Sequence, residues 1–91
     1  MKELFVDTRQ GEGEDGCRYS FDYYILIDQM QVASGFACES YGVKVAASGG
    51  GDEAHIPNIT TSISRIDDLA QLLMRNLVTP TTLEEVVQDW L

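Results

Sequence analysis

The sequence has few of the residues on which several classes of protein depend. Its 91 residues include 2 cysteines, 2 prolines and 1 histidine. Cys17 and Cys38 are too few for a disulfide scaffold, and they lack the close paired spacing of zinc ligands. We therefore expect reduced thiols that are buried or half-buried, with a disulfide as the alternative.

Positive charge is also scarce. The chain has 15 acidic residues and only 6 lysines and arginines, so its formal net charge is -9. Such a field repels phosphate backbones and anionic membrane surfaces, so we expect no direct nucleic-acid binding. No apolar run approaches the roughly 18 residues of a membrane span, and the first residues do not form a signal segment. The chain is expected to be a folded cytoplasmic protein, since its 44% hydrophobic residues are typical of globular domains.

The first two-thirds of the chain alternates between apolar and polar residues, which is typical of strands. The strongest strand is predicted from Arg18 to Asp28. It follows a first strand at residues 3–9, in which Leu4, Val6 and Thr8 alternate with Phe5 and Asp7, and a loop at 10–17. One face of the stronger strand carries Tyr19, Phe21, Tyr23, Ile25 and Ile27.

The segments that follow are harder to divide. Residues 28–31 are interpreted as a tight turn, and residues 32–47 as either two short strands or one long bent strand. The glycine-rich residues 48–54 form a loop. Pro57 interrupts residues 56–63, which are predicted to be an edge strand or an extended crossover.

Two helices are predicted at the C-terminus, at residues 64–77 and 80–91. Ser64 is the expected N-cap of the first helix, and Thr79 and Pro80 are typical of the start of the second. The apolar stripes that the helices should turn toward the core are Ile66, Leu69, Ala70, Leu73 and Leu77 in the first, and Leu83, Val86, Val87, Trp90 and Leu91 in the second.

These elements predict a single α+β domain over residues 1–91, because strands precede helices instead of alternating with them. An antiparallel sheet of three to five strands, a β-meander within residues 1–63, should pack on one face against the two helices. The residues expected to be mostly buried are Phe21, Tyr23, Ile25, Leu69, Leu73, Val86, Val87 and Trp90.

The C-terminal residues resemble those of a known family. They read Val78-Thr79-Pro80, Leu83, Val86-Val87 and Asp89-Trp90-Leu91, with Tyr41-Gly42-Val43 earlier in the chain. The chain resembles a family of short Firmicutes proteins of unknown function, whose members end in a V-T-P-x-x-L-x-x-V-V-x-D-W-L-like helix. The resemblance implies a Gram-positive source and carries no activity or ligand with it.

No arrangement of residues in the sequence demands catalysis, a cofactor or a metal. His55 has no serine or cysteine at a diagnostic spacing. The acidic run of Glu12, Glu14 and Asp15 is too short for a calcium loop, and residues 49–51 lack the lysine of a phosphate-binding loop. We therefore predict no catalytic, cofactor-binding or metal-binding residues, no small-molecule substrate, and a protein that is not an enzyme.

Two features depart from local rules. Asp89 lies in the last turn of a helix, where negative charge opposes the helix dipole, so it should have a structural ion pair with Arg65, Arg75 or Lys44, or contact a partner. Phe5, Tyr24 and Leu26 point away from the predicted helices and form the candidate interaction face.

Three functional hypotheses follow from these features. The favoured one is a protein-interaction or regulatory module, in one form a homodimer through the outer face of the sheet. The alternatives are an acidic mimic of nucleic acid that binds a basic protein surface, and an accessory subunit of an enzyme.

Overall fold

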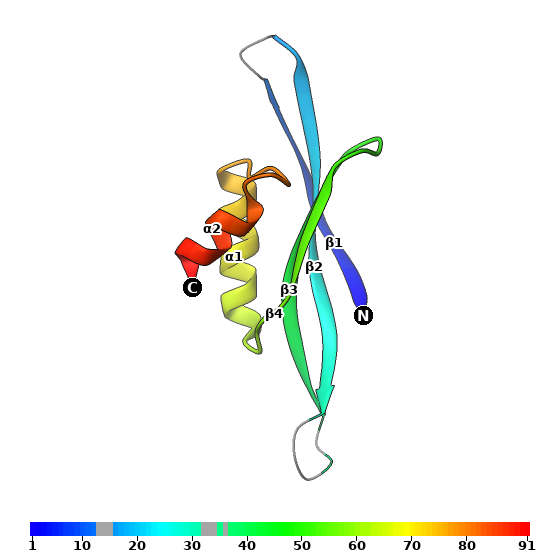
Figure 1. The fold of residues 1–91 in the computed structure, drawn as a ribbon, viewed down its shortest axis with the longest axis vertical. Helices are drawn as coiled ribbons and strands as arrows, with labels where there is room; N and C mark the ends of the chain where they lie inside the picture. The colour runs from blue at the N-terminus through cyan, green and yellow to red at the C-terminus, as the bar shows by residue number, and fades with distance from the viewer. Residues whose placement is uncertain (13–15, 32–34, 36) are drawn as a thin grey trace.

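The computed structural model describes residues 1–12, 16–31, 35 and 37–91 of the chain. The strands form one antiparallel sheet in the order β1-β2-β3-β4, and both helices pack on one side of it (Figure 1). The predicted α+β fold is confirmed. The bounds of the elements are β1 Lys2–Glu12, β2 Arg18–Gln31, β3 Ala37–Ala47, β4 Glu53–Thr60, α1 Ile63–Arg75 and α2 Leu83–Trp90.

Strand β2 is the longest strand, with 14 residues, and it lies inside the sheet between β1 and β3. Its alternation turns Phe21, Tyr23, Ile25 and Ile27 toward the helices, as predicted. The tight turn predicted at residues 28–31 is wrong, because β2 continues to Gln31 and pairs there with β3. The long-range pairing outweighs the polar local sequence.

Strand β1 contains a β-bulge that the sequence pattern did not predict. Phe5 pairs with Tyr24, but the next paired residue, Asp7, faces Tyr23, so Val6 is the extra residue. A bulge shifts the side-chain alternation by one residue. Thr8 therefore lies with Asp22 on the side away from the helices, and not on the same side as Leu4 and Val6.

Strands β3 and β4 decide between the alternatives left open for residues 32–47 and 56–63. The described part of residues 32–47 contains one strand, β3, while residues 32–34 and 36 lie outside the described part. Strand β4 is an edge strand, as one reading of residues 56–63 had it. Residues 48–52 make the turn between them, in which the Ala47 amide donates to the Asp52 carbonyl at 2.8 Å.

Helix α1 begins one residue earlier than expected, at Ile63, and ends in a Schellman motif. Its N-cap is Ser62, whose hydroxyl accepts a bond from the Arg65 amide at 3.3 Å, so the predicted cap at Ser64 is wrong. At the other end Leu77 adopts φ 49°, and the Val78 amide donates to the Leu73 carbonyl at 2.9 Å.

Helix α2 is shorter than predicted, because residues 79–82 form a turn before it. The Thr82 amide donates to the Thr79 carbonyl at 3.2 Å, and Thr82 takes the N-cap position. Thr79 and Pro80 therefore precede the helix and do not start it. Leu83 and Val87 face inward and are buried.

The main core lies between the inner face of the sheet and the helices. Of the predicted core, Tyr23, Leu69, Leu73 and Val87 are buried, whereas Phe21, Ile25, Val86 and Trp90 are half-buried at its margin. The prediction for Trp90 was therefore too strong. The Arg65 guanidinium stacks over the Trp90 ring, 4.5 Å from its centroid.

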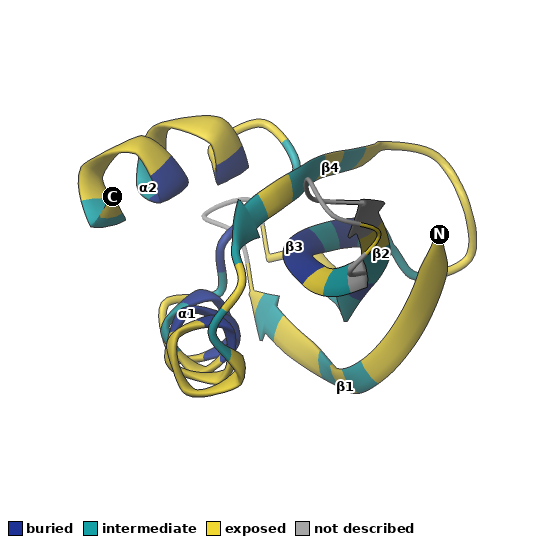
Figure 2. Cartoon of the chain, turned by 90° about the horizontal axis from the view of Figure 1, so that it is seen from below, coloured by how far each residue is buried: buried dark blue, intermediate teal, exposed yellow. Residues whose placement is uncertain are grey.

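The molecule is elongated, with principal extents of 55 × 25 × 18 Å. Its radius of gyration of 14.2 Å exceeds the roughly 12 Å of a compact chain of this length. Figure 2 shows both helices on one side of the sheet, with β1 an edge strand that is exposed along most of its length. Within the described residues, neither helix is long and apolar enough to cross a membrane.

Candidate functional site

The helical layer is much shorter than the sheet that it covers. Strand β2 has 14 residues and so extends about 46 Å, whereas α1 has 13 residues and a length of about 20 Å. Figure 1 shows the β1–β2 and β2–β3 ends of the sheet extending beyond α1 in both directions. Apolar residues on the inner face are therefore left without a helix over them at each end.

One such region is a groove beside the N-terminal turn of α1, with a volume of about 690 Å³. The inner face of the sheet forms its floor and the first turns of α1 form its wall. We call it the end groove, and its lining residues are Leu4, Ile25, Ile27, Glu39, Tyr41, Ile63, Ser64, Ile66 and Asp67.

The end groove combines apolar side chains with acidic rims. Leu4 from β1, on the floor, is 53% exposed and Ile63 from α1, on the wall, is 69% exposed, which is unusual for two large aliphatic residues that line one depression. Glu39 and Asp67 are exposed and lie at its margins. An occupant would thus meet an apolar floor flanked by carboxylates.

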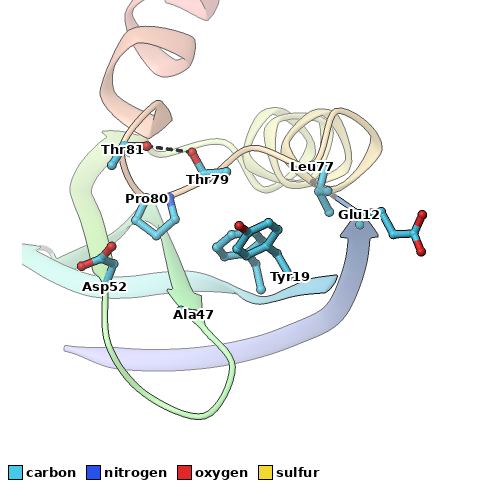
Figure 3. A pocket seen from close by; sticks show the side chains of 10 residues that line it. Glu12, Tyr19, Ala47, Asp52, Leu77, Thr79, Pro80 and Thr81 are labelled. Carbon is cyan, nitrogen blue, oxygen red and sulfur yellow. Dashed lines mark hydrogen bonds between the residues drawn. The ribbon is translucent and has the colours of Figure 1, made fainter. Parts of the chain in front are cut away.

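The opposite end of the inner face carries a smaller pocket of about 360 Å³. In Figure 3 the Tyr19 ring occupies its centre, between Leu77 and Pro80, and the Glu12 carboxylate points away from it. The hydroxyls of Thr79 and Thr81 lie 3.0 Å apart on the same wall. The lining residues are Gly11, Glu12, Tyr19, Phe21, Ala47, Asp52, Leu77, Thr79, Pro80 and Thr81.

This pocket offers a small aromatic and hydroxyl surface. Its carboxylates, from Glu12 and Asp52, belong to different hairpins. Across the described part of the chain, no group of three or more histidine, cysteine, aspartate or glutamate side chains is placed to hold a metal ion. Residues 13–15, which adjoin Glu12, are outside the described part.

The outer face of the sheet brings Phe5 and Tyr24 together, as the strand alternation predicted. The two residues are direct cross-strand partners, and their rings meet edge to face with centroids 5.6 Å apart. Phe5 is 53% exposed and Tyr24 is half-buried. The third residue of the candidate interaction face, Leu26, lies on the same side but is only 2% exposed.

The expectation that nothing covers Leu26 was therefore wrong. Leu26 pairs with Gly42, and a side chain at position 42 would collide with the backbone of Ile56 and Pro57. Strand β4 reaches this position because its register with β3 shifts between Tyr41 and Val43. The bent edge strand thus closes over this part of the outer face.

Near the β1–β2 hairpin, the described part of the outer face carries polar side chains that are hydrogen-bonded to one another. The Asp22 carboxylate accepts bonds from the Thr8 hydroxyl at 2.6 Å and the Ser48 hydroxyl at 2.8 Å. The Ser20 hydroxyl in turn donates to Ser48 at 3.0 Å. These groups have partners within the chain, so they add little to a binding surface.

Lys44 ties the strands of the outer face together. Its ammonium lies 2.7 Å from Glu3 and 3.5 Å from Glu53, and 5.2 Å from the centroid of the Tyr24 ring. The hydrogen bond to Glu3, with the neighbouring negative charges, raises the pKa of Lys44 above its ordinary value. The amine is therefore held as a structural cation and is unsuited to nucleophilic chemistry.

The other residues singled out in the sequence do not converge on a site. His55 is exposed on β4, and residues 49–51 form the β3–β4 turn. Cys38 is half-buried as expected, but Cys17 is exposed, so the expectation of a buried or half-buried thiol is wrong there. The two cysteines lie at opposite ends of β2, so a disulfide cannot join them within one chain.

Asp89 lacks the predicted structural ion pair, because within the described residues no cationic group lies within ion-pair distance of it. Two of the three cations considered for it are engaged elsewhere. Arg65 stacks on Trp90, and Lys44 pairs with acidic residues of the sheet. The carboxylate of Asp89 is exposed, which lets water solvate it at the end of α2.

Sequence reasoning missed the end groove, although its signal was present. The sequence pattern predicts Ile63 as the end of an extended segment, yet it is the first residue of α1. Strand alternation predicts that Leu4 faces inward, but it does not show whether a helix reaches it. Comparison of the expected lengths of the strands and the helices would have revealed the uncovered end.

Comparison with known proteins gives a family and no activity. A family model described as "Family of unknown function (DUF6514)" matches residues 2–91. No curated protein and no solved structure matches the chain.

Proposed function

The chain belongs to the DUF6514 family, whose function is unknown, and we propose that it is a protein-interaction module that binds its partner in the end groove. The observation that carries the proposal is the exposure of Leu4 and Ile63, which come from the sheet and from α1 and line the same apolar depression. Covering such surface with a partner is favourable by ~25 cal/mol per Å². The same surface adds nothing to the stability of the isolated domain.

The end groove supports this function better than the outer face does. On the outer face Leu26 is buried and only Phe5 offers a large exposed apolar side chain among the three candidate residues. A homodimer through that face would have a small apolar centre, surrounded by side chains that already bond to one another. Specific interfaces need a fully desolvated apolar centre, which the end groove can supply.

The two alternative functions are less well supported. A nucleic-acid mimic needs acidic residues along one face, whereas Glu39 and Asp67 border an apolar groove and Lys44 forms ion pairs with Glu3 and Glu53. An accessory subunit of an enzyme would also bind through an apolar surface, so it is a special case of the proposed module. We assign no catalytic residue to the chain.

We propose further that the protein is cytoplasmic and comes from a Firmicutes bacterium. The proposed location is consistent with the net charge of -9 and with the small number of cysteines, 2 in 91 residues. The proposed source rests on the C-terminal residues from Val78 to Leu91 and their resemblance to short Firmicutes proteins.

Affinity capture from a lysate of the source organism tests the groove directly. The tagged wild-type chain is compared with a double variant, Leu4→Ser with Ile63→Ser, in which the two exposed aliphatic side chains of the groove are replaced by polar ones. Because both positions are exposed, we expect near-native stability and the loss of a protein that the wild type retains.

Phe5→Ser is the matched control, since it removes an equally exposed apolar side chain from the outer face. It should retain the partner. If the double variant still captures the same protein while Phe5→Ser loses it, the binding surface is the outer face and the groove proposal fails.

A further inference from the structure

The shape of the end groove selects the kind of segment that can fill it. Its floor is the inner face of a β-sheet and its wall is α1, so an occupant would lie on the sheet beside a helix. In a two-layer α+β fold the element that packs at this position is another helix. A segment of that kind would complete the helical layer, which α1 and α2 leave short.

An added strand fits the neighbouring edge less well. Strand β1 is the free edge nearest the groove, but the bulge at Val6 interrupts its pairing pattern after Phe5. It also carries exposed charged residues along its length, among them Lys2, Glu3, Asp7 and Arg9. Bulges and charges of this kind oppose edge-to-edge pairing.

The electrostatics of the groove select the charge of the occupant. Glu39 on the sheet side and Asp67 on the helix side place a carboxylate on each rim. Lys2, in the cavity next to the groove, is the nearby cation, and the net charge of the chain is -9. A partner with basic side chains beside its apolar face is complementary to both the rims and the overall field.

A second copy of this chain is a poor occupant. The exposed face of α2, its shorter helix, carries Glu84, Glu85 and Asp89, which would face Glu39 and Asp67. Like charges placed opposite one another disfavour association.

We propose that the end groove binds an amphipathic helix from another protein, with an apolar face against Leu4, Ile25 and Ile63 and basic side chains beside Glu39 and Asp67. This inference rests on the proposed function and specifies its partner class. The partner helix packs along α1 and fills the uncovered end of the sheet, in the helix-in-groove mode of recognition.

Synthetic peptides of known chemistry test the inference without knowledge of the natural partner. The first probe is a helix of roughly 18 residues with leucine on one face and lysine on the other, about five turns long. The second replaces every lysine with glutamate, and the third has the composition of the first in an order without an apolar face. Fluorescence anisotropy at about 0.15 M salt, where the Debye length is about 8 Å, measures binding, and circular dichroism measures helix formation in the complex.

Protein variants of matched charge locate the contact. Asp67→Asn and Asp68→Asn change the net charge equally and both positions are exposed on α1, but only Asp67 lines the groove. We expect the lysine peptide to bind as a helix and to lose about two- to fivefold in affinity with Asp67→Asn and nothing measurable with Asp68→Asn. Ile63→Ser, which keeps the net charge, should weaken binding about tenfold.

The possible results separate the partner class from the proposed function. If the glutamate peptide binds as tightly as the lysine peptide, and Ile63→Ser weakens both, the basic partner is wrong and the groove remains the binding surface. If the reordered peptide binds as well as the first, the attraction is unspecific charge and the inference is overturned. Binding without a gain in helix overturns the helical occupant. If Ile63→Ser changes nothing, the proposed function fails as well.

Discussion

Tyr23 connects the sheet to the helical layer through a single polar contact inside the core. Its ring is 1% exposed at the centre of the inner face, and its hydroxyl donates to the Val78 carbonyl at 2.9 Å. That carbonyl follows the Schellman motif at the end of α1, where backbone groups need partners from outside the helix. One side chain therefore fixes where α1 ends relative to β2.

Removing this hydroxyl should destabilise the domain without changing its fold. Tyr23→Phe keeps the ring in the core but leaves the buried Val78 carbonyl without its partner, so we expect a loss of about 1 to 3 kcal/mol in the free energy of unfolding. Urea denaturation followed by circular dichroism measures the change. A variant as stable as the wild type would show that water or a rearranged backbone satisfies the carbonyl.

The same residue makes stability depend on pH in the alkaline range. Burial raises the pKa of Tyr23 from 10.0 to about 12. The unfolded chain loses this proton first, so the contribution is complete below pH 10 and disappears as the pH rises to about 12, with a total of roughly 2 to 3 kcal/mol. Tyr23→Phe should therefore show a flatter stability profile than the wild type between these limits, and parallel profiles would contradict the assignment.

Leu26 shows how a residue on the outer face can belong to the interior. We expect Leu26→Glu to destabilise the domain by at least about 3 kcal/mol, because its carboxylate would be desolvated beside Gly42 and would oppose Glu3, the cross-strand partner that already pairs with Lys44. Phe5→Glu is the control on the same face, and its exposure should limit the loss to about 1 kcal/mol, most of it from the ring contact with Tyr24. Thermal unfolding compares the two. Equal and small effects would mean that β4 does not close over Leu26 in solution.

At the scale of the elements, the bend in β4 depends on Gly42 having no side chain. The backbone of Ile56 and Pro57 occupies the position of a Cβ at residue 42. Because backbone atoms cannot turn aside as a side chain can, Gly42→Ala should cost about 1 to 3 kcal/mol and loosen β4 from β3. Hydrogen exchange of the β4 amides would show the loosening.

Gly11→Ala provides the matched control for this prediction. A Cβ at position 11 would meet the end of the Leu77 side chain, which can adopt another rotamer. We expect a smaller loss than for Gly42→Ala and no effect on β4. The reverse order of the two losses would contradict the role given to Gly42.

The elements that the sequence predicted well are those determined by local patterns. The alternation in β2 and the apolar stripes of the two helices identified the inner face and the order of strands before helices. The bulge at Val6 and the extension of β2 to Gln31 depend on pairing with distant strands, so local polarity misled the prediction there. The burial of Leu26 depends on a contact between Gly42 and β4, which no local pattern encodes.

The candidate site was predicted less well than the fold, for a related reason. Strand alternation placed Phe5 next to Tyr24 correctly, since those positions follow from two adjacent strands. The end groove arises from the difference in length between the sheet and the helical layer, which involves four elements at once. Predicting it requires the strand bounds, and those were the least certain part of the sequence interpretation.

At the scale of the whole molecule, net charge and exposed apolar surface act in opposite directions. The chain carries -9 on 91 residues, and the resulting repulsion between copies should oppose self-association at neutral pH even though Leu4 and Ile63 are exposed. We therefore expect a monomer at pH 7. An elongated acidic monomer is consistent with a module that binds a partner of opposite charge.

Lowering the pH toward the isoelectric point of about 4.2 should remove this repulsion and show which apolar surface mediates self-association. We expect reversible self-association there, measured by size-exclusion chromatography with light scattering, and its loss in Ile63→Ser. Circular dichroism at the same pH must show the folded state, because an unfolded chain would also aggregate. Phe5→Ser leaves the net charge and the end groove unchanged, so it should associate like the wild type. If Phe5→Ser abolishes association and Ile63→Ser does not, the exposed aromatic pair of the outer face is the contact surface, as a homodimer through that face would require.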